Sequence, residues 1–429
     1  MIVPPYKVKL VEPIKLLPYR ERKRAIEEAG FNPFLLPSKT VFIDLVSDSG
    51  TSAMSIKQLG SMFSGDESFA FQEGFYLLRK SVKEHFGFPY VLPMHQGRAI
   101  EDILFEILVK KGDIIPSNSL FETTRVIIER NGGEPIDLPG DGGDIDIKRL
   151  KDLLKASSDC IPFILMTLTN NTRYGLPVSL DNLRKLSLLL KKYNIPVIFD
   201  ASRFAENCYF IWKTEKRKKR FRDVVKEVFS FAETVYMSTK KDGLCNTGGL
   251  FMTGSRKLYN RVIEVMTVKE GFPSHGGLPD RDIWAIVNGL EETLEEDYIQ
   301  HRIYQVEYLH KLLKDKKIPV FDPPGGHAVY IIASKILPDH QFPGFALASE
   351  IFVKGGIRVG VFGGDLAASD TPEYIRLSIP RRVYSESHLE YVAEVVGRVV
   401  EDAQKIPRLN ITYLPREMRI FGARFRRAE

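Results

Sequence analysis

Patterns of buried strands alternate with patterns of amphipathic helices along most of this 429-residue chain. Short apolar runs bounded by turn residues predict strands, and apolar residues spaced three or four apart predict helices. The strands are predicted at 90–94, 162–169, 196–200, 234–238 and 249–253, and the helices between them include 99–109 and 180–192. This alternation is typical of an α/β fold in which helices wrap a mainly parallel sheet. Ligands of such sheets bind at the carboxyl ends of the strands.

A different pattern begins near residue 300. It predicts a long helix at 291–314, a strand at 328–333 and helices at 344–354 and 386–403. We therefore expect a large domain at 48–299 and a smaller α/β domain at 300–429, with residues 1–47 forming an N-terminal arm and part of the small domain. We find no internal repeat.

Asp200 closes one predicted strand, and Lys241 follows the next one. A pyridoxal phosphate (PLP) enzyme needs such a pair, because the lysine forms the Schiff base and the carboxylate pairs with the pyridinium nitrogen. The positive charge of the neighbouring Lys240 is expected to lower the pKa of Lys241 and so favour the reactive amine. The pair alone is a loose pattern that also occurs in proteins without this chemistry.

A second signal lies upstream, where Gln96, Gly97 and Arg98 join the strand at 90–94 to the helix at 99–109. A tight turn into a helix N-terminus binds anions, since free backbone N–H groups and the helix dipole face the ligand. Arg98 can add a charge-assisted contact, and Ser238, three residues before Lys241, can add a hydroxyl donor. The alternative is that Gly97 only permits a turn and that Arg98 is solvated.

Many collinear blocks carry a resemblance that covers nearly the whole chain: Glu27 to Asn32, Asp48 to Thr51, His95 to Arg98, Asp200 to Arg203, Ser238 to Asp242, Glu270 to Leu278, Gly325 to Val329, Arg376 to Arg381 and Ala423 to Phe425. On these blocks the sequence resembles the PLP-dependent β-eliminating lyases of the tryptophanase and tyrosine phenol-lyase group. That family has the aspartate aminotransferase fold, PLP fold type I, with a mainly parallel seven-stranded sheet in its large domain.

The resemblance implies a role for each matching residue. Phe121 stacks on the cofactor ring, Asn171 and Arg203 contact the region of its phenolic oxygen, and Arg376 clamps the substrate carboxylate with a bidentate fork. The implied cofactor-binding set is Gln96, Gly97, Arg98, Phe121, Asn171, Asp200, Arg203, Ser238 and Lys241. The implied substrate-binding set is Ser47, Asn171, Arg376, Glu122, Phe362 and Ile420. The catalytic residues among them are Lys241, Asp200 and Arg376.

The resemblance also implies a monovalent cation and an oligomer. Gly50, Glu67 and Asn246 match the family's potassium site, and an oxygen-only ligand set suits an alkali ion better than a transition metal. Active sites of this fold family lie at a subunit interface, so we expect a homodimer or a homotetramer.

Other positions depart from the family pattern. Phe69 replaces a tyrosine that both named enzymes use at the phosphate and as a proton donor. Glu122, Phe362 and Ile420 occupy the positions that distinguish tryptophanase from tyrosine phenol-lyase, and neither specificity is kept. Two residues could restore a proton donor: His275, which replaces a tyrosine, and Glu122, if burial raises its pKa. A purely structural role for both is the competing interpretation.

The expected function is therefore β-elimination on an L-amino acid with an aromatic or thioether side chain, giving pyruvate and ammonia through a quinonoid intermediate. The alternatives are an aminotransferase or aldolase of the same fold, and a non-catalytic protein that binds PLP or an amino acid.

Charge and composition bear on partners and location. The net charge is +6, with seven basic residues in one segment: Lys213, Lys216, Arg217, Lys218, Lys219, Arg220 and Arg222. Without a recognised nucleic-acid module, a solvated surface is the favoured interpretation, and we expect no nucleic-acid partner. The start of the chain lacks a signal-peptide pattern, and no apolar run is long enough to span a membrane. We expect no membrane contact, a cytoplasmic location and reduced thiols at Cys160, Cys208 and Cys245.

Overall fold

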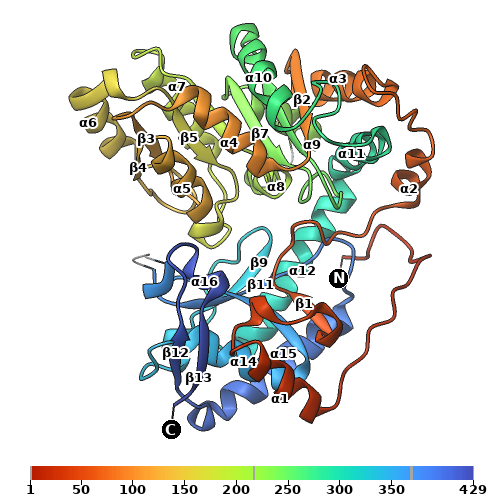
Figure 1. Cartoon of the computed structure of the whole chain (residues 1–429), viewed down its shortest axis with the longest axis vertical. Coiled ribbons are helices and arrows are strands. Elements are labelled where there is room, and N and C mark those ends of the chain that lie inside the picture. Colours follow the sequence, from red (N-terminus) through yellow and green to blue (C-terminus); the bar gives the residue numbers. More distant parts are fainter. Residues whose placement is uncertain (1, 216–217, 368–370, 429) are drawn as a thin grey trace. The chain divides into compact units, whose positions relative to one another are not determined.

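The chain divides into two units, a large unit of residues 49–300 and a small unit of residues 1–48 and 301–429. The structure is a computed structural model that describes residues 2–215, 218–367 and 371–428. Figure 1 traces the elements of both units in chain order.

The large unit is built on a seven-stranded sheet, as the sequence predicts. Its strands, in spatial order, are β2 (Tyr90–Met94), β8 (Gly249–Thr253), β7 (Thr234–Ser238), β6 (Val197–Asp200), β5 (Ile164–Thr167), β3 (Ile114–Ser117) and β4 (Glu134–Asp137). Strand β8 runs antiparallel to both of its neighbours, and the strands from β7 to β4 pair in parallel. The carboxyl ends of β6 and β7 therefore meet at one edge of the sheet.

Ten helices of the large unit surround or flank this sheet among the described residues (Figure 1). They are α2 (Ile56–Met62), α3 (Glu73–His85), α4 (Gly97–Leu108), α5 (Glu122–Arg130), α6 (Ile147–Ser157), α7 (Leu180–Leu190), α8 (Phe204–Thr214), α9 (Phe221–Phe229), α10 (Arg256–Lys269) and α11 (Asp280–Thr293). The next helix, α12, spans Glu296–Asp315. The prediction of one continuous helix at 291–314 is wrong. The chain is not helical between Thr293, where α11 ends, and Glu296, where α12 begins. There the Thr293 hydroxyl donates to the Asp242 carbonyl, and the Glu296 carboxylate accepts from the Phe221 N–H.

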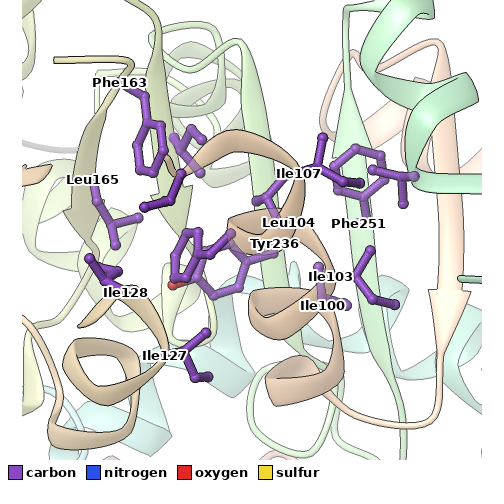
Figure 2. Packing of buried hydrophobic residues seen from close by; sticks show 14 of the residues in the cluster. Ile100, Ile103, Leu104, Ile107, Ile127, Ile128, Phe163, Leu165, Tyr236 and Phe251 are labelled. Carbon is purple, nitrogen blue, oxygen red and sulfur yellow. The ribbon is translucent and has the colours of Figure 1, made fainter. Parts of the chain in front are cut away.

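The core of the large unit lies between α4 and the sheet. Ile100, Ile103 and Leu104 of α4 pack with Ile198 of β6 and Tyr236 of β7 in one buried cluster. Figure 2 shows Tyr236 among the side chains of α4 and α5. Because side chains alternate along a strand, the face that carries Ile198 also carries Asp200, and the face that carries Tyr236 also carries Ser238. The functional candidates Asp200 and Ser238 thus lie on the α4 face of the sheet, at the carboxyl ends of their strands.

The small unit contains a four-stranded sheet and a two-stranded sheet. The first has the order β1 (Ile43–Leu45), β10 (Ile357–Phe362), β11 (Tyr374–Ser378) and β9 (Ala328–Ile331), and the second pairs β12 (Leu409–Tyr413) with β13 (Arg424–Arg427). Its helices besides α12 are α1 (Tyr19–Glu28), α13 (Ala333–Ile336), α14 (Pro343–Gly355), α15 (Glu386–Glu401) and α16 (Arg419–Gly422). Strand β1 pairs in parallel with β10, so the start of the chain completes this sheet.

The basic segment at 213–222 lies on the surface of the large unit and is paired with acids. Lys219 contacts Glu227 at 2.7 Å, and Arg220 contacts Asp223 at 2.9 Å. Arg222 contacts Glu291 and Glu295, while Lys216 and Arg217 lie outside the described residues. Local pairing thus offsets part of the positive charge. None of the helices in the described ranges is both long enough and apolar enough to cross a bilayer.

Candidate functional site

Asp200 is the last residue of β6, and one of its carboxylate oxygens is available. Its Oδ1 accepts a hydrogen bond from the Ser202 N–H at 3.0 Å. Within the described residues no donor reaches Oδ2. The Ser202 contact fixes the carboxylate and leaves the second oxygen to accept from a cationic N–H group.

Lys241 lies in the turn that follows β7, at the same edge of the sheet. Its N–H donates to the Ser238 carbonyl at 3.4 Å, and its own carbonyl accepts from the Leu244 N–H at 3.0 Å. The neighbouring Lys240 is half-buried, and burial together with the positive charge of Arg98 lowers the pKa of Lys240. The turn thus places Lys241 next to the strand that ends in Asp200, and it places Lys240 near the positive charge of Arg98.

Gly97, Ser238 and the start of α4, which the sequence predicts to bind the phosphate, lie together in the structure. A Cβ atom at Gly97 would lie only 3.0 Å from the Ser238 Cβ, so glycine is what allows α4 to approach β7 this closely. The Ser238 hydroxyl is buried and has no hydrogen-bond partner among the described residues. No side chain caps the first turn of α4, because Gln96 at the N-cap makes no capping contact. A phosphate would satisfy both the hydroxyl and the free N–H groups.

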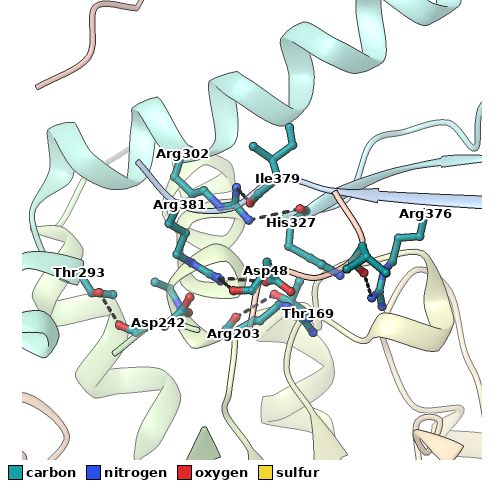
Figure 3. Close-up of polar contacts among 12 residues, drawn as sticks. Asp48, Thr169, Arg203, Asp242, Thr293, Arg302, His327, Arg376, Ile379 and Arg381 are labelled. Carbon is teal, nitrogen blue, oxygen red and sulfur yellow. Dashed lines mark hydrogen bonds and ion pairs between the residues drawn. The ribbon is translucent and has the colours of Figure 1, made fainter. Parts of the chain in front are cut away.

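Three further cofactor candidates lie on loops of the large unit. Phe121 is the N-cap residue of α5, and its ring contacts no other aromatic ring in the described part of the chain. Asn171 is buried in a short 3-10 turn, and Arg203 is buried directly before α8. The Thr169 hydroxyl donates to the Arg203 carbonyl at 3.0 Å, which fixes the backbone there (Figure 3). An open carboxylate oxygen, an unsatisfied hydroxyl and an uncommitted ring fit PLP.

Arg376 lies in the middle of β11 in the small unit and is almost fully buried. Its Nη2 donates to the Val46 carbonyl at 3.0 Å (Figure 3), and its guanidinium carbon lies 4.2 Å from the centre of the Phe362 ring. At that distance the ring face attracts the cation. Phe362 is therefore already committed to a contact with the residue predicted to bind the substrate carboxylate.

The other substrate candidates of the small unit surround an aromatic cluster. Phe362 packs against Phe34, Tyr374 and Phe421, with ring centres 5.9 to 6.4 Å apart. Ile420, at 1% exposure, belongs to α16, and its carbonyl accepts from the Asn32 amide at 3.0 Å. Ser47 is half-buried and follows β1 by two residues. Two of the predicted specificity positions, Phe362 and Ile420, are thus occupied by packed apolar side chains.

The structure connects two of the three predicted cation ligands. The Asn246 amide donates to the Gly50 carbonyl at 2.9 Å, and the Gly50 N–H donates to the Lys240 carbonyl. Glu67 has other partners, since its carboxylate accepts from the backbone N–H groups of Asp280 and Arg281. The potassium site therefore stays a prediction.

Burial shifts the pKa values of the two predicted proton donors in opposite directions. Burial alone raises the pKa of Glu122, the first residue of α5, to about 7. Burial lowers the pKa of His275, and its Nδ1 accepts from the Gly277 N–H at 3.1 Å. Phe69 is 76% exposed, and its ring contacts those of Phe272 and His275. Near neutral pH, Glu122 holds a transferable proton more readily than His275 does.

Sequence reasoning missed Glu101, a buried carboxyl group on α4. The hydroxyls of Tyr236 and Thr124 donate to its Oε1 at 2.9 and 2.7 Å. The only sequence signal is an acidic residue on the apolar face of a predicted amphipathic helix. Its partners come from β7 and α5, far away in the sequence, so pattern analysis of one helix could not identify them.

Comparisons with known proteins identify the family of this chain. Residues 44–395 match the family model described as "Beta-eliminating lyase". The chain is 41% identical to a tyrosine phenol-lyase of Pasteurella multocida over 98% of both chains, and 40% identical to a probable tryptophanase of Aeropyrum pernix over 96% of this chain and 94% of that one.

Solved structures extend the comparison to the fold. A serine palmitoyltransferase of Sphingomonas wittichii superposes with a TM-score of 0.67 at 12% identity, covering 90% of this chain and 97% of the other. At that identity the likeness concerns the fold alone, and it confirms the predicted PLP fold type I. The fold, the matched family model and the two relatives lead to one conclusion: this chain belongs to the β-eliminating lyase family and is a PLP-dependent lyase.

Proposed function

We propose that the protein cleaves an L-amino acid with an aromatic or thioether side chain by β-elimination, releasing pyruvate and ammonia. One observation carries this proposal. At the edge of the large sheet, one carboxylate oxygen of Asp200 accepts no hydrogen bond from the described residues, and Asp200 lies beside the strand that leads to Lys241. Bound PLP would withdraw electrons from the substrate Cα once its ring nitrogen is protonated. Asp200 would hold that proton through its Oδ2.

The remaining steps belong to side chains of this protein. Arg376 would bind the substrate α-carboxylate by charge-assisted hydrogen bonds and so orient the Cα–H bond. The amine of Lys241, free once the substrate has taken its place, would remove the Cα proton. The bond from Cβ to the leaving group then breaks as the Cα–Cβ double bond forms. Lys241 would then take back its place and so release the enamine, which water would hydrolyse to pyruvate and ammonia.

Glu122 is our candidate for protonating the leaving group. It has no hydrogen-bond or ion-pair partner among the described residues, and burial raises its pKa to about 7. The protonated fraction therefore falls as pH rises through about 7. We expect E122Q to lower kcat for a poor leaving group such as indole or phenol by about 10²- to 10⁴-fold and to spare substrates with a thiolate leaving group. Steady-state kinetics on both substrate types would check this, and equal losses on both would assign Glu122 another role.

The proposal is tested by pyruvate release from the purified protein supplied with PLP and potassium. Substrates are tryptophan, tyrosine, serine, cysteine and several S-substituted cysteines, and no keto acid is added. Pyruvate from S-substituted cysteines supports β-elimination with good leaving groups. Transfer of the amino group only when a keto acid is added would favour an aminotransferase. Cofactor binding without any product from the whole panel would favour a binding protein.

A further inference from the structure

Glu101 is a carboxyl group on a helix face that is otherwise apolar. It is 6% exposed, and Ile100, Ile103, Leu104 and Phe105 beside it on α4 are fully buried. A buried carboxyl group costs free energy unless its surroundings compensate for lost hydration. The proposed elimination steps do not use Glu101, so a buried carboxyl group at this position needs another reason.

Hydrogen bonds from two other elements hold Glu101 in place. Tyr236 of β7 donates at 2.9 Å and Thr124 of α5 donates at 2.7 Å, both to Oε1. No described residue donates a hydrogen bond to Oε2. The contacts fix the position of the carboxyl group between α4, α5 and the sheet, and they leave one oxygen uncommitted.

Asp200 is the charged neighbour of this group. The register of β6 and β7 pairs Asp200 with Tyr236, whose hydroxyl contacts Glu101. Burial, followed by the negative charge of Asp200, raises the pKa of Glu101 to about 7, while its two hydrogen bonds and Arg98 act in the opposite direction. Glu101 therefore gains its negative charge as pH rises through the neutral range, beside the carboxylate predicted to hold the cofactor nitrogen.

We propose that Glu101 is a positioning residue for the cofactor: together with Asp200 it supplies a second negative charge near the ring nitrogen of PLP and keeps that nitrogen protonated in mildly alkaline solution. The inference rests on the proposed use of PLP but not on β-elimination. An opposite charge nearby favours the protonated form of a cationic nitrogen.

The test uses protein loaded with PLP that carries nitrogen-15 in its ring, because the chemical shift of that nitrogen reports its protonation without turnover. E101Q removes the charge and keeps an oxygen that can accept from Tyr236 and Thr124. We expect the variant to bind PLP and to show a lower deprotonation midpoint for the ring nitrogen, with proton affinity reduced about tenfold or more. Identical titrations for the variant and the wild type would overturn the proposal.

Y236F is the second variant, and it protects the test if E101Q does not fold. It removes one hydrogen bond that favours the ionised carboxylate, so the charge of Glu101 should appear at higher pH. We expect the ring-nitrogen midpoint to move in the same direction as in E101Q, by a smaller amount. An unchanged midpoint in Y236F, with E101Q unfolded, would also overturn the proposal.

These results separate the two proposals. Pyruvate release with an unchanged nitrogen titration in the variants would reject the role of Glu101 and leave β-elimination in place. No pyruvate from any substrate, with a shifted titration in E101Q, would reject β-elimination and support Glu101. A merely structural role predicts a lower melting temperature with no change in the nitrogen signal.

Discussion

The cofactor residues of the large unit and the substrate residues of the small unit differ in how fully their groups are used. In the large unit, Asp200 keeps an open oxygen and the buried Ser238 hydroxyl has no partner among the described residues. In the small unit, Arg376 lies against the Phe362 ring, and Ile420 is packed at 1% exposure. Open polar groups cost stability and are maintained where a ligand satisfies them.

This difference between the two units separates the residues predicted to bind the cofactor from those predicted to select the leaving group. Among the residues predicted to bind the cofactor, Asp200 has an oxygen that a ring nitrogen would satisfy and Ser238 has a hydroxyl that a phosphate would satisfy. Two of the three positions predicted to distinguish tryptophanase from tyrosine phenol-lyase, Phe362 and Ile420, hold buried apolar side chains that pack within the protein, and the third is Glu122. This difference predicts that the protein shares the chemistry at Cα with the family and differs from both enzymes in how it recognises the leaving group.

K241A should produce the largest effect, because it removes both the covalent attachment of PLP and the base. We expect loss of the visible absorbance of the lysine-bound cofactor and a fall in kcat of at least about 10²- to 10⁴-fold for loss of the base alone. Absorbance spectra and pyruvate release measure the two. K240A is the matched control, since it changes the adjacent lysine and should keep the attachment. A wild-type spectrum in K241A would mean that another amine binds the cofactor.

R376A tests the small unit at its only predicted charged contact with the substrate. A hydrogen bond to a charged group contributes about 1.5–3 kcal/mol, so kcat/KM should fall by about 10- to 150-fold, mainly through KM. Cofactor affinity should not change. If PLP affinity fell and KM did not, Arg376 would belong to the cofactor site instead.

The positions of five strands of the large sheet could be predicted because those strands are locally encoded, whereas their order in the sheet was not predicted. Residues 90–94, 234–238 and 249–253 were predicted to the residue, since each is an apolar run bounded by polar or glycine residues. The position of Asp200 and Lys241 at one edge of the sheet could be predicted, because a parallel sheet places the ends of neighbouring strands together.

Other features depend on partners far away in the sequence. The break after Thr293 involves its hydrogen bond to Asp242, and neither residue interrupts the helical pattern near 291–314. The contact between Phe362 and Arg376 joins two adjacent strands of the small sheet, which the sequence analysis did not predict. Such pairs follow from tertiary packing and not from local pattern.

S238A should weaken PLP binding without weakening the fold. The hydroxyl is buried without a partner in the protein alone, so its removal should leave the melting temperature of the cofactor-free protein unchanged or slightly higher. A phosphate contact would be lost, and the Kd for PLP should rise by about 10-fold or more. Titration with PLP and thermal unfolding measure these two quantities. Destabilised cofactor-free protein with unchanged PLP affinity would make Ser238 a structural residue.

F362L should change the kinetic constants least of these variants. It distinguishes two roles for the Phe362 ring, which are support of Arg376 and selection of the leaving group. If Phe362 supports Arg376, its loss removes a cation–π contact of about 0.5–1 kcal/mol, and KM should rise about 2- to 5-fold for every amino acid, because all carry the same carboxylate. If Phe362 selects the leaving group, as its position in the sequence predicts, kcat/KM should change for some side chains and not for others. Kinetics on a short and a bulky S-substituted cysteine distinguish these outcomes. The 4.2 Å contact leads us to expect the uniform change, which would mean that the residue replacing a specificity group now serves the part of the substrate common to all amino acids.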